Sequence, residues 1–124
     1  KLQRALYTLM AEVAATGENV EKFSKISDDS IAELEGLIDH LAMGMDTPGG
    51  FIIPGDLPAS AAISVSRAIT RRAERRVTEL FNRGDIRNAA TLRYLNRLSS
   101  FLFVLEIKLV QEAPGVSLTF ARED

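Results

Sequence analysis

Apolar residues recur at intervals of three and four along the first part of the chain, which is the spacing of amphipathic helices. The first pattern covers residues 1–15 and ends at the Thr-Gly pair that follows. Because no capping residue precedes Lys1, we expect the first helix to be cut and earlier residues to be missing. A second helix is predicted to start with a capping box of Ser30 and Glu33 and to continue to Met45.

Two longer helices are predicted after a Pro/Gly-rich connection. The third covers residues 59–82 and the fourth residues 86–112, with Gly84 between them and Asp85 or Asn88 as the cap of the fourth. Apolar residues of the fourth helix cover more of its surface than a single apolar stripe, so we expect this helix to be central or to contact another chain. The apolar stripe expected to bury the third helix consists of Ala62, Val65, Ile69, Ala73, Val77 and Leu80.

These patterns predict an all-α antiparallel helical bundle. Four helices joined by short links are typical of this class, and no strand-like alternation persists along the chain. At 124 residues the chain is long enough to bury one hydrophobic core. Residues 1–124 are therefore expected to form a single domain.

Composition excludes several kinds of function. The chain has no cysteine and one histidine, His40, so disulfides, thiolate chemistry, a His-rich metal site and a Ser-His-Asp triad are not expected. Glu106 and Lys108 interrupt the apolar run FLFVLEIKLV before it reaches membrane-spanning length. The net charge of −2 argues against general polyanion binding. We expect a cytoplasmic protein with no membrane or nucleic-acid partner and no metal held by protein ligands.

The segment FIIPGDLPASAAISVSRAITRRAERR concentrates arginines on the third predicted helix. On a helical wheel Arg67, Arg71 and Glu74 share one face, with Arg75 beside them, nearly opposite the apolar stripe. We therefore expect this face to point to solvent in a lone bundle. The clustered arginines are Arg67, Arg71, Arg72, Arg75 and Arg76.

Two interpretations of this face remain open on the pattern alone. It can be a solvated surface with intrahelical pairs, such as Arg71 with Glu74 and Arg75 with Glu79. It can also bind an anion, because the planar fork of arginine suits phosphate and carboxylate and the preceding turn brings backbone amides to the start of the helix. A nucleic-acid surface is disfavoured, because RRAERR lacks interleaved aromatic residues and a recognisable reader motif.

Two segments, FIIPGDLPASAAISVSRAITRRAERRVTEL and LRYLNRLSSFLFVLE, resemble the PduO-type ATP:cob(I)alamin adenosyltransferases. The family pattern is Phe-x-x-Pro-Gly-Gly, Arg-x-x-x-Arg-Arg-Ala-Glu-Arg and then Leu-Asn-Arg-Leu-Ser-Asp, and the resemblance covers essentially the whole chain. It implies a five-helix bundle that assembles as a homotrimer, with ATP bound between subunits. The implied reaction needs Mg²⁺ and transfers the 5′-deoxyadenosyl group of ATP to the cobalt of cob(I)alamin, with release of triphosphate. The implied further partners are a reductase and a cobalamin-dependent enzyme.

The resemblance also implies roles for particular residues. Arg67 matches an arginine that forms an intersubunit salt bridge to an aspartate near the active site. Phe51 matches the phenylalanine beneath the corrin ring and Phe103 another aromatic of that pocket, although Phe51 on its own pattern can equally be a core residue that closes the end of the bundle. The implied ATP-binding residues are Arg71, Arg72, Glu74, Arg75 and Asn96, and the implied catalytic residues are Arg67, Arg71 and Glu74.

The chain departs from the family pattern in several places. The family's glycine-rich ATP segment and its first helix, which carries the aspartate partner of Arg67, are absent from these residues. Asp56 stands where the family usually has a second glycine, Ser64 where many members have histidine, and Ser100 where the last motif has aspartate. A catalytically weak relative that acts as an ATP- or corrinoid-binding sensor or carrier is therefore an alternative. A structural bundle whose arginines bind a protein partner is a second one.

Overall fold

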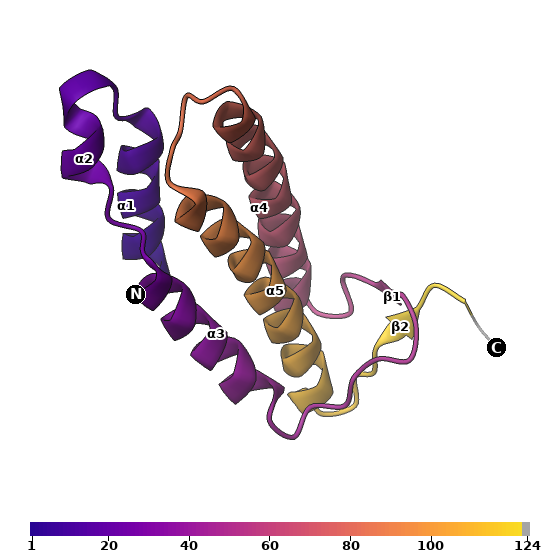
Figure 1. The fold of residues 1–124 in the computed structure, drawn as a ribbon. Coiled ribbons are helices and arrows are strands. Elements are labelled where there is room, and N and C mark those ends of the chain that lie inside the picture. Colours follow the sequence, from indigo (N-terminus) through magenta and orange to yellow (C-terminus); the bar gives the residue numbers. More distant parts are fainter. Residues whose placement is uncertain (123–124) are drawn as a thin grey trace.

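A computed structural model describes residues 1–122 of the chain as a helical bundle with one small sheet at its end (Figure 1). Most of these residues are helical, which confirms the predicted all-α class. None of the helices within residues 1–122 combines the length and apolar character needed to cross a membrane. In chain order the elements are α1 (Leu2–Ala14), η1 (Gly17–Asn19), α2 (Val20–Phe23), α3 (Asp28–Ala42), β1 (Ile52–Ile53), α4 (Pro58–Asn82), α5 (Ala89–Glu112) and β2 (Thr119–Phe120).

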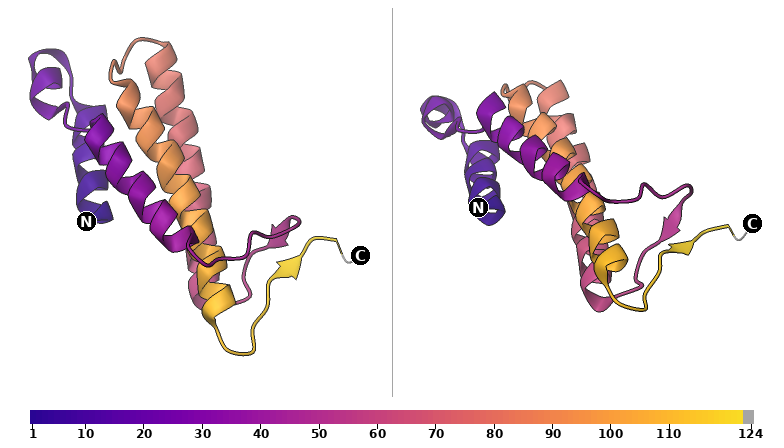
Figure 2. Two further views of the ribbon diagram at one scale, coloured as in Figure 1. Left: turned by 60° about the horizontal axis from the view of Figure 1, so that its bottom comes forward. Right: turned by 90° about the horizontal axis from the view of Figure 1, so that it is seen from below.

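The central element of the bundle is α5. It packs against α3 on one side and against α4 on the other, and two further views show the same order (Figure 2). The wide apolar surface predicted for this helix therefore reflects contact with two neighbours, as expected for a central position. The core residues that α5 contributes are Ala90, Tyr94, Leu95, Leu98 and Phe101.

The boundaries of α3 follow local capping chemistry. Its capping box joins Ser27 and Ser30, so the predicted box of Ser30 and Glu33 is wrong by one turn. The earlier start is favoured because Ser27 has the extended backbone of an N-cap, with φ −132° and ψ 173°. The helix also ends earlier than predicted, at Ala42, which leaves Met45 in the following connection.

A buried carboxylate connects α1 to the start of α5. Glu12 accepts hydrogen bonds from the backbone amides of Lys25 and Ile26, each at 3.1 Å. It also accepts one from Asn88 Nδ2 at 2.5 Å, and Asn88 caps α5 through its bond to the amide of Ala90. The buried charge is thus fully hydrogen-bonded, which is the condition under which a folded protein tolerates it. One of the two caps proposed for this helix, Asn88, is confirmed.

A short antiparallel sheet forms where no strand was predicted. Ile52 of β1 pairs with Phe120 of β2, and Ile53 pairs with Thr119. Asp56 strengthens this contact, because its carboxylate accepts hydrogen bonds from the Thr119 amide at 3.1 Å and from Thr119 Oγ1 at 2.6 Å. Strands of two residues are too short to show an alternating pattern. Their pairing brings the segment before α4 to the last described residues of the chain (Figure 1).

Candidate functional site

The face of α4 that lies against α5 carries Arg67 and Glu74. Neither residue is fully exposed, whereas Val65 and Ile69 of the predicted buried stripe are 60% and 52% exposed. The prediction is therefore wrong for Val65 and Ile69, which do not face the core, and for Arg67 and Glu74, which do not face solvent. It is confirmed near the end of the helix, where Val77 is buried and Leu80 packs against the core, and for the exposed Arg71 and Arg75. Within residues 1–122, α5 is the long helix against which α4 packs, and it offers polar and aromatic partners to the polar face of α4.

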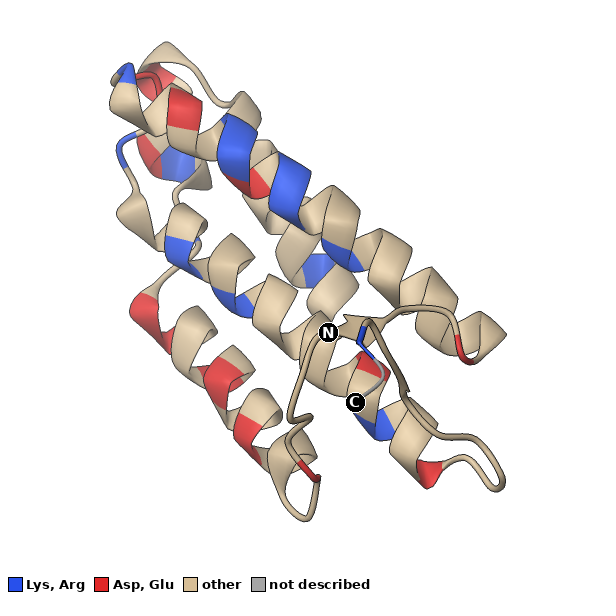
Figure 3. Ribbon diagram, turned by 90° about the vertical axis from the view of Figure 1, so that its right-hand side faces the viewer, with Lys and Arg blue, Asp and Glu red and all other residues tan. Residues whose placement is uncertain are grey.

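The two outer helices of the bundle differ in charge, with mainly basic residues on α4 and acidic residues on α3 (Figure 3). The arginine cluster lies on α4, and α3 carries five acidic residues but no lysine or arginine. The central helix α5 separates the two groups. The chain therefore has a basic side and an acidic side despite its small net charge. The acidic residues of α3 are Asp28, Asp29, Glu33, Glu35 and Asp39.

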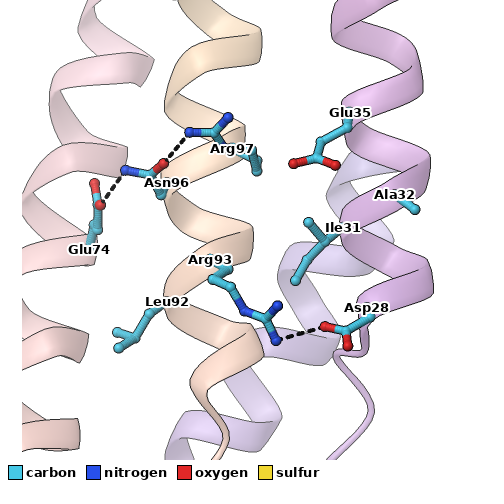
Figure 4. A pocket seen from close by; sticks show the side chains of 9 residues that line it. All are labelled: Asp28, Ile31, Ala32, Glu35, Glu74, Leu92, Arg93, Asn96 and Arg97. Atoms are coloured by element: carbon cyan, nitrogen blue, oxygen red, sulfur yellow. Dashed lines mark hydrogen bonds and ion pairs between the residues drawn. The ribbon is translucent and has the colours of Figure 1, made fainter.

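Four polar side chains of α4 and α5 form a continuous chain of hydrogen bonds. Arg71 Nη1 donates to Glu74 Oε2 at 2.6 Å. The other oxygen, Glu74 Oε1, accepts from Asn96 Nδ2 at 3.0 Å. Arg97 Nη2 donates to Asn96 Oδ1 at 2.6 Å and so fixes which way the Asn96 amide points (Figure 4). The structure thus brings Arg71, Glu74 and Asn96 together, and it adds Arg97.

Arg97 was not selected from the sequence. The signal for it was nonetheless present, because it directly follows Asn96 in the LNR triplet of the second motif. Its importance becomes visible only when the orientation of the Asn96 amide is known. Since both Asn96 amide atoms are held by charged neighbours, the position of this side chain depends on both helices.

Arg71 keeps most of its hydrogen-bonding capacity free. A guanidinium has five N–H donors, and the contact with Glu74 is the one hydrogen bond that Arg71 donates within residues 1–122. Its side chain is 44% exposed, whereas that of Glu74 is 16% exposed. Glu74 therefore holds one edge of the guanidinium, and the remaining donors can bind an anion at the surface.

Arg72, Arg75 and Arg76 of the cluster are exposed. Arg76 pairs with Glu79 at 3.2 Å. The predicted pair of Arg75 with Glu79 is therefore wrong, because the partner of Glu79 is the neighbouring Arg76. Arg72 and Arg75 form no ion pair within residues 1–122. The pair of Arg71 with Glu74, which the solvated-surface interpretation predicted, is confirmed. Arg71 differs from Arg76 in that its partner Glu74 also binds Asn96 of α5.

Arg67 lies against an aromatic ring of α5. Its guanidinium carbon is 5.0 Å from the centre of the Phe103 ring, which is within the range of a cation–π contact. Its Nε is buried and has no hydrogen-bond partner within residues 1–122. The structure thus joins two residues to which the resemblance assigned separate roles.

Glu106 lies one turn beyond Phe103 on α5 and is only 3% exposed. Burial raises the pKa of its carboxyl above the usual value of a glutamate, the positive charge of Arg67 acts to lower this pKa, and the negative charge of Asp56 acts to raise it. A nearly buried carboxyl therefore lies within the electrostatic reach of Arg67. Neither the helical pattern nor the family motif had marked this residue as functional.

Phe51 is 89% exposed, so the interpretation of it as a core residue is wrong. The carbonyl of Phe51 accepts a hydrogen bond from the amide of Ala121 at 2.8 Å, which holds the segment before β1 next to the end of β2. Phe103 is half-buried and stacks on Arg67. The Phe51 ring is consequently free to contact a flat apolar ligand.

The three residues that depart from the family pattern have different surroundings. Asp56 binds Thr119, as described above, and so has a structural contact of its own. Ser100 donates to the carbonyl of Asn96 in its own helix at 3.3 Å. Ser64 is half-buried on α4, and nothing in the structure explains its replacement of histidine.

A cleft of about 540 Å³ opens between α3 and α5 next to the hydrogen-bonded chain (Figure 4). An ion pair of Arg93 with Asp28, 2.7 Å long, crosses it from one helix to the other. The volume is in the range of small-molecule sites, and charges of both signs line the cleft. The residues that line it are Asp28, Ile31, Ala32, Glu35, Glu74, Leu92, Arg93, Asn96 and Arg97.

Comparison with known proteins shows the family of this chain. The family model described as cobalamin adenosyltransferase matches residues 1–109. The corrinoid adenosyltransferase PduO of Salmonella typhimurium is 35% identical over 105 residues, which are 84% of this chain and 31% of that protein. A corrinoid adenosyltransferase of Citrobacter freundii is 36% identical over 116 residues, which are 93% of this chain and 65% of that protein. The chain thus spans less than two thirds of the length of these relatives.

Solved structures share the fold. A variant PduO-type ATP:corrinoid adenosyltransferase from Lactobacillus reuteri, complexed with cobalamin and ATP, superposes with a TM-score of 0.82 at 26% identity, covering 98% of this chain and 67% of that one. A second variant from the same organism, complexed with ATP, gives a TM-score of 0.80 at 25% identity and the same coverage of both chains. Since the family model covers all but the last 15 of the 124 residues, the chain belongs to the cobalamin adenosyltransferase family.

Proposed function

We propose that the protein transfers the 5′-deoxyadenosyl group of ATP to the cobalt of cob(I)alamin and releases triphosphate. The observation that carries this proposal is the chain of hydrogen bonds from Arg71 through Glu74 and Asn96 to Arg97, with free guanidinium donors at its Arg71 end. Relatives of the chain are corrinoid adenosyltransferases, and related structures hold ATP and cobalamin. The residues proposed to contact ATP are Arg71, Arg72, Glu74, Arg75 and Asn96.

The reaction makes a specific demand on these residues. A cobalt–carbon bond forms at C5′ of the ribose, and the bond from C5′ to the triphosphate oxygen breaks, with its electron pair leaving on triphosphate. Co(I) is itself the nucleophile, so no general base is required. What the protein must stabilise is the negative charge that develops on the leaving group, and fixed guanidinium donors do so without reorganising during the reaction. Arg71, held on one edge by Glu74, is suited to this task.

The corrinoid is proposed to lie near the small sheet. The exposed ring of Phe51 would cover one corrin face and exclude a lower axial ligand, which favours a four-coordinate cobalt that is easier to reduce. Phe103 would contribute to the same pocket from α5. A reductase that supplies cob(I)alamin and a cobalamin-dependent enzyme that takes up the product are the proposed partners, in the cytoplasm.

Magnesium is proposed to enter with ATP. Both oxygens of Glu74 already accept hydrogen bonds, from Arg71 and from Asn96, so this carboxylate is not a free metal ligand. No group of three metal-ligating side chains lies close together within residues 1–122. The triphosphate oxygens are therefore the proposed ligands, as is common for this ion.

We also propose a homotrimer with ATP bound between subunits. Val65 and Ile69 expose an apolar strip on α4 beside the arginine cluster, and α3 is acidic. Contact between the basic side of one subunit and the acidic side of the next is head-to-tail, and such contacts form a ring when the rotation between subunits closes, as it does in a trimer. In this arrangement Arg67 would meet an acidic residue of the neighbouring subunit.

Spectroscopy of the full-length protein tests the proposed reaction. The protein is incubated with ATP, Mg²⁺ and chemically reduced cobalamin, and the loss of cob(I)alamin absorbance is followed with time. We expect many turnovers per subunit, formation of adenosylcobalamin and release of one triphosphate for each product. Binding of ATP or corrinoid without turnover would contradict this function and support the sensor or carrier alternative.

A further inference from the structure

Two charged side chains in the contact between α4 and α5 lie within electrostatic reach of one another, and neither has an ion-pair partner within residues 1–122. Arg67 is partly buried, and its Nε–H is fully covered and makes no hydrogen bond. Glu106 is 3% exposed, and its carboxyl accepts no hydrogen bond and forms no ion pair in this part of the chain. A buried donor that remains unpaired is costly, because it has lost its contacts with water, and a carboxylate is the acceptor that suits a guanidinium best.

The arrangement of α5 explains why these two groups belong together. Phe103 and Glu106 are three residues apart and therefore neighbours on one face of the helix. The guanidinium of Arg67 lies over the Phe103 ring on that face, 5.0 Å from its centre. Glu106 is thus placed one helical turn from the ring on which Arg67 rests.

We propose that Glu106 is a positioning residue for Arg67, and that its carboxylate accepts the buried Nε–H when the site binds its anionic partner. A guanidinium offers its donors on separate edges of one plane. With the Nε edge turned toward Glu106 and the flat face on Phe103, the Nη groups of Arg67 point away from α5, toward an anion or an acidic group of a neighbouring subunit. The inference rests on the proposed function, because that function places such an anion there.

The charges around Glu106 are compatible with this role. From α4 it faces Arg67, and from the connection before α4 it faces Asp56, whose carboxylate is held by Thr119. The other helix packed against α5 is α3, and the charged groups that act on Glu106 are Arg67 and Asp56, neither of which lies on it. Arg67 is therefore the positive group that can neutralise Glu106 in the described part of the chain.

A double-mutant cycle on the full-length protein tests the coupling. The variants are Glu106→Gln, which keeps size and shape, Arg67→Met, and the two combined. The control is Glu112→Gln, an exposed glutamate of the same helix that pairs with Lys108. We expect Glu106→Gln to lower kcat/KM about tenfold in the wild-type background and less than twofold in the Arg67→Met background, because interacting residues are not additive. We also expect Glu106→Gln to remove one ionisation from the pH profile of kcat/KM, whereas the control leaves the profile unchanged.

The same cycle on thermal unfolding, measured with ATP present, provides a readout that needs no activity. We expect coupling of a few degrees in Tm between the two sites, within the range for contacting residues in a domain of this size. Equal effects of Glu106→Gln in both backgrounds, in kinetics and in unfolding, would overturn the inference. An inactive wild-type protein would instead contradict the proposed function, and the unfolding cycle would then decide whether Glu106 and Arg67 act as a pair.

Discussion

Asn96 Nδ2 donates a 3.0 Å hydrogen bond to Glu74 Oε1 across the contact between α5 and α4. The second oxygen of Glu74 holds Arg71, so this one carboxylate fixes two donors from two helices. Arg97 holds the far side of the Asn96 amide. The position of Arg71 is therefore set by a network of hydrogen bonds, and we expect the loss of any one of them to shift the Arg71 side chain.

The first prediction concerns Glu74. In Glu74→Gln one acceptor oxygen becomes an NH₂ donor, which must face either Arg71 or the Asn96 amide, so one of the two hydrogen bonds is lost. We expect kcat/KM to fall about 10- to 100-fold, because a misplaced guanidinium stabilises the leaving group less well. Steady-state kinetics measures the change, and Glu79→Gln, in the exposed pair with Arg76, is the matched control. Equal activity of the two variants would contradict the role of Glu74.

Arg71 itself is the subject of the second prediction. A charge-assisted contact with phosphate contributes about 1.5–3 kcal/mol, and more where charge develops in the transition state. Arg71→Ala should therefore lower turnover or ATP affinity about 10- to 1000-fold, and Arg71→Lys should restore only part of this because lysine lacks the fork. The same substitutions of Arg76 should change activity less than twofold, as expected for a surface pair. If Arg71→Ala had wild-type kinetics, Arg71 would be a solvated surface residue with no role in the reaction.

A third prediction separates binding from folding at Phe51. Because its side chain is 89% exposed, Phe51→Ala should change the free energy of unfolding by no more than about 0.5 kcal/mol. Adenosylation that starts from cob(II)alamin and a reductant should nevertheless be slowed, since one corrin face is no longer shielded. The rate of adenosylcobalamin formation and the far-ultraviolet circular dichroism are measured in parallel. Loss of helicity in the variant would show that Phe51 stabilises the fold instead.

The fourth prediction is a pH dependence of stability. Burial raises the pKa of Glu106 in the folded protein above its unfolded value, so the folded state prefers the protonated carboxyl. The stability that this preference contributes is complete below the unfolded pKa and is lost as pH rises through the folded pKa. Glu106→Gln cannot ionise, so its unfolding free energy relative to wild type should increase over that same pH range. Denaturant unfolding at several pH values checks this, with Glu112→Gln as the control that shows no such trend.

Assembly is the subject of the fifth prediction. Light scattering at micromolar concentration should give the mass of a homotrimer for the wild-type protein. Ile69→Asp should shift the mass toward the monomer, because a charge would replace an apolar contact in the proposed subunit interface. Met10→Asp, at a residue of α1 that is 65% exposed, is the control and should leave the mass unchanged. A monomeric wild-type protein would contradict the proposed assembly.

Local patterns determined most of the helices. Periodic apolar residues predicted α1, α3, α4 and α5 in the right order, and Asn88 and Gly84 marked the ends of two of them. These predictions succeed because helix formation and capping depend on residues within about one turn of each other. The two motifs likewise marked Arg71, Glu74 and Asn96, although they lie on different helices.

The rotation of α4 was decided by its packing. A wheel of α4 alone favoured burial of Val65 and Ile69, yet the side that faces α5 carries Arg67 and Glu74. Which face of a helix is covered depends on the side chains that its neighbour presents, and the pattern of one helix contains no information about them.

The contacts that define the candidate site are of the same kind. The bond between Asn96 and Glu74 joins residues 22 positions apart, and the bond between Asn88 and Glu12 joins residues 76 positions apart. The pairing of β1 with β2 and the cation–π contact of Arg67 with Phe103 also connect separate segments. None of these contacts has a periodic signature in the sequence, so only the folded chain, in which these segments are placed against one another, specifies them.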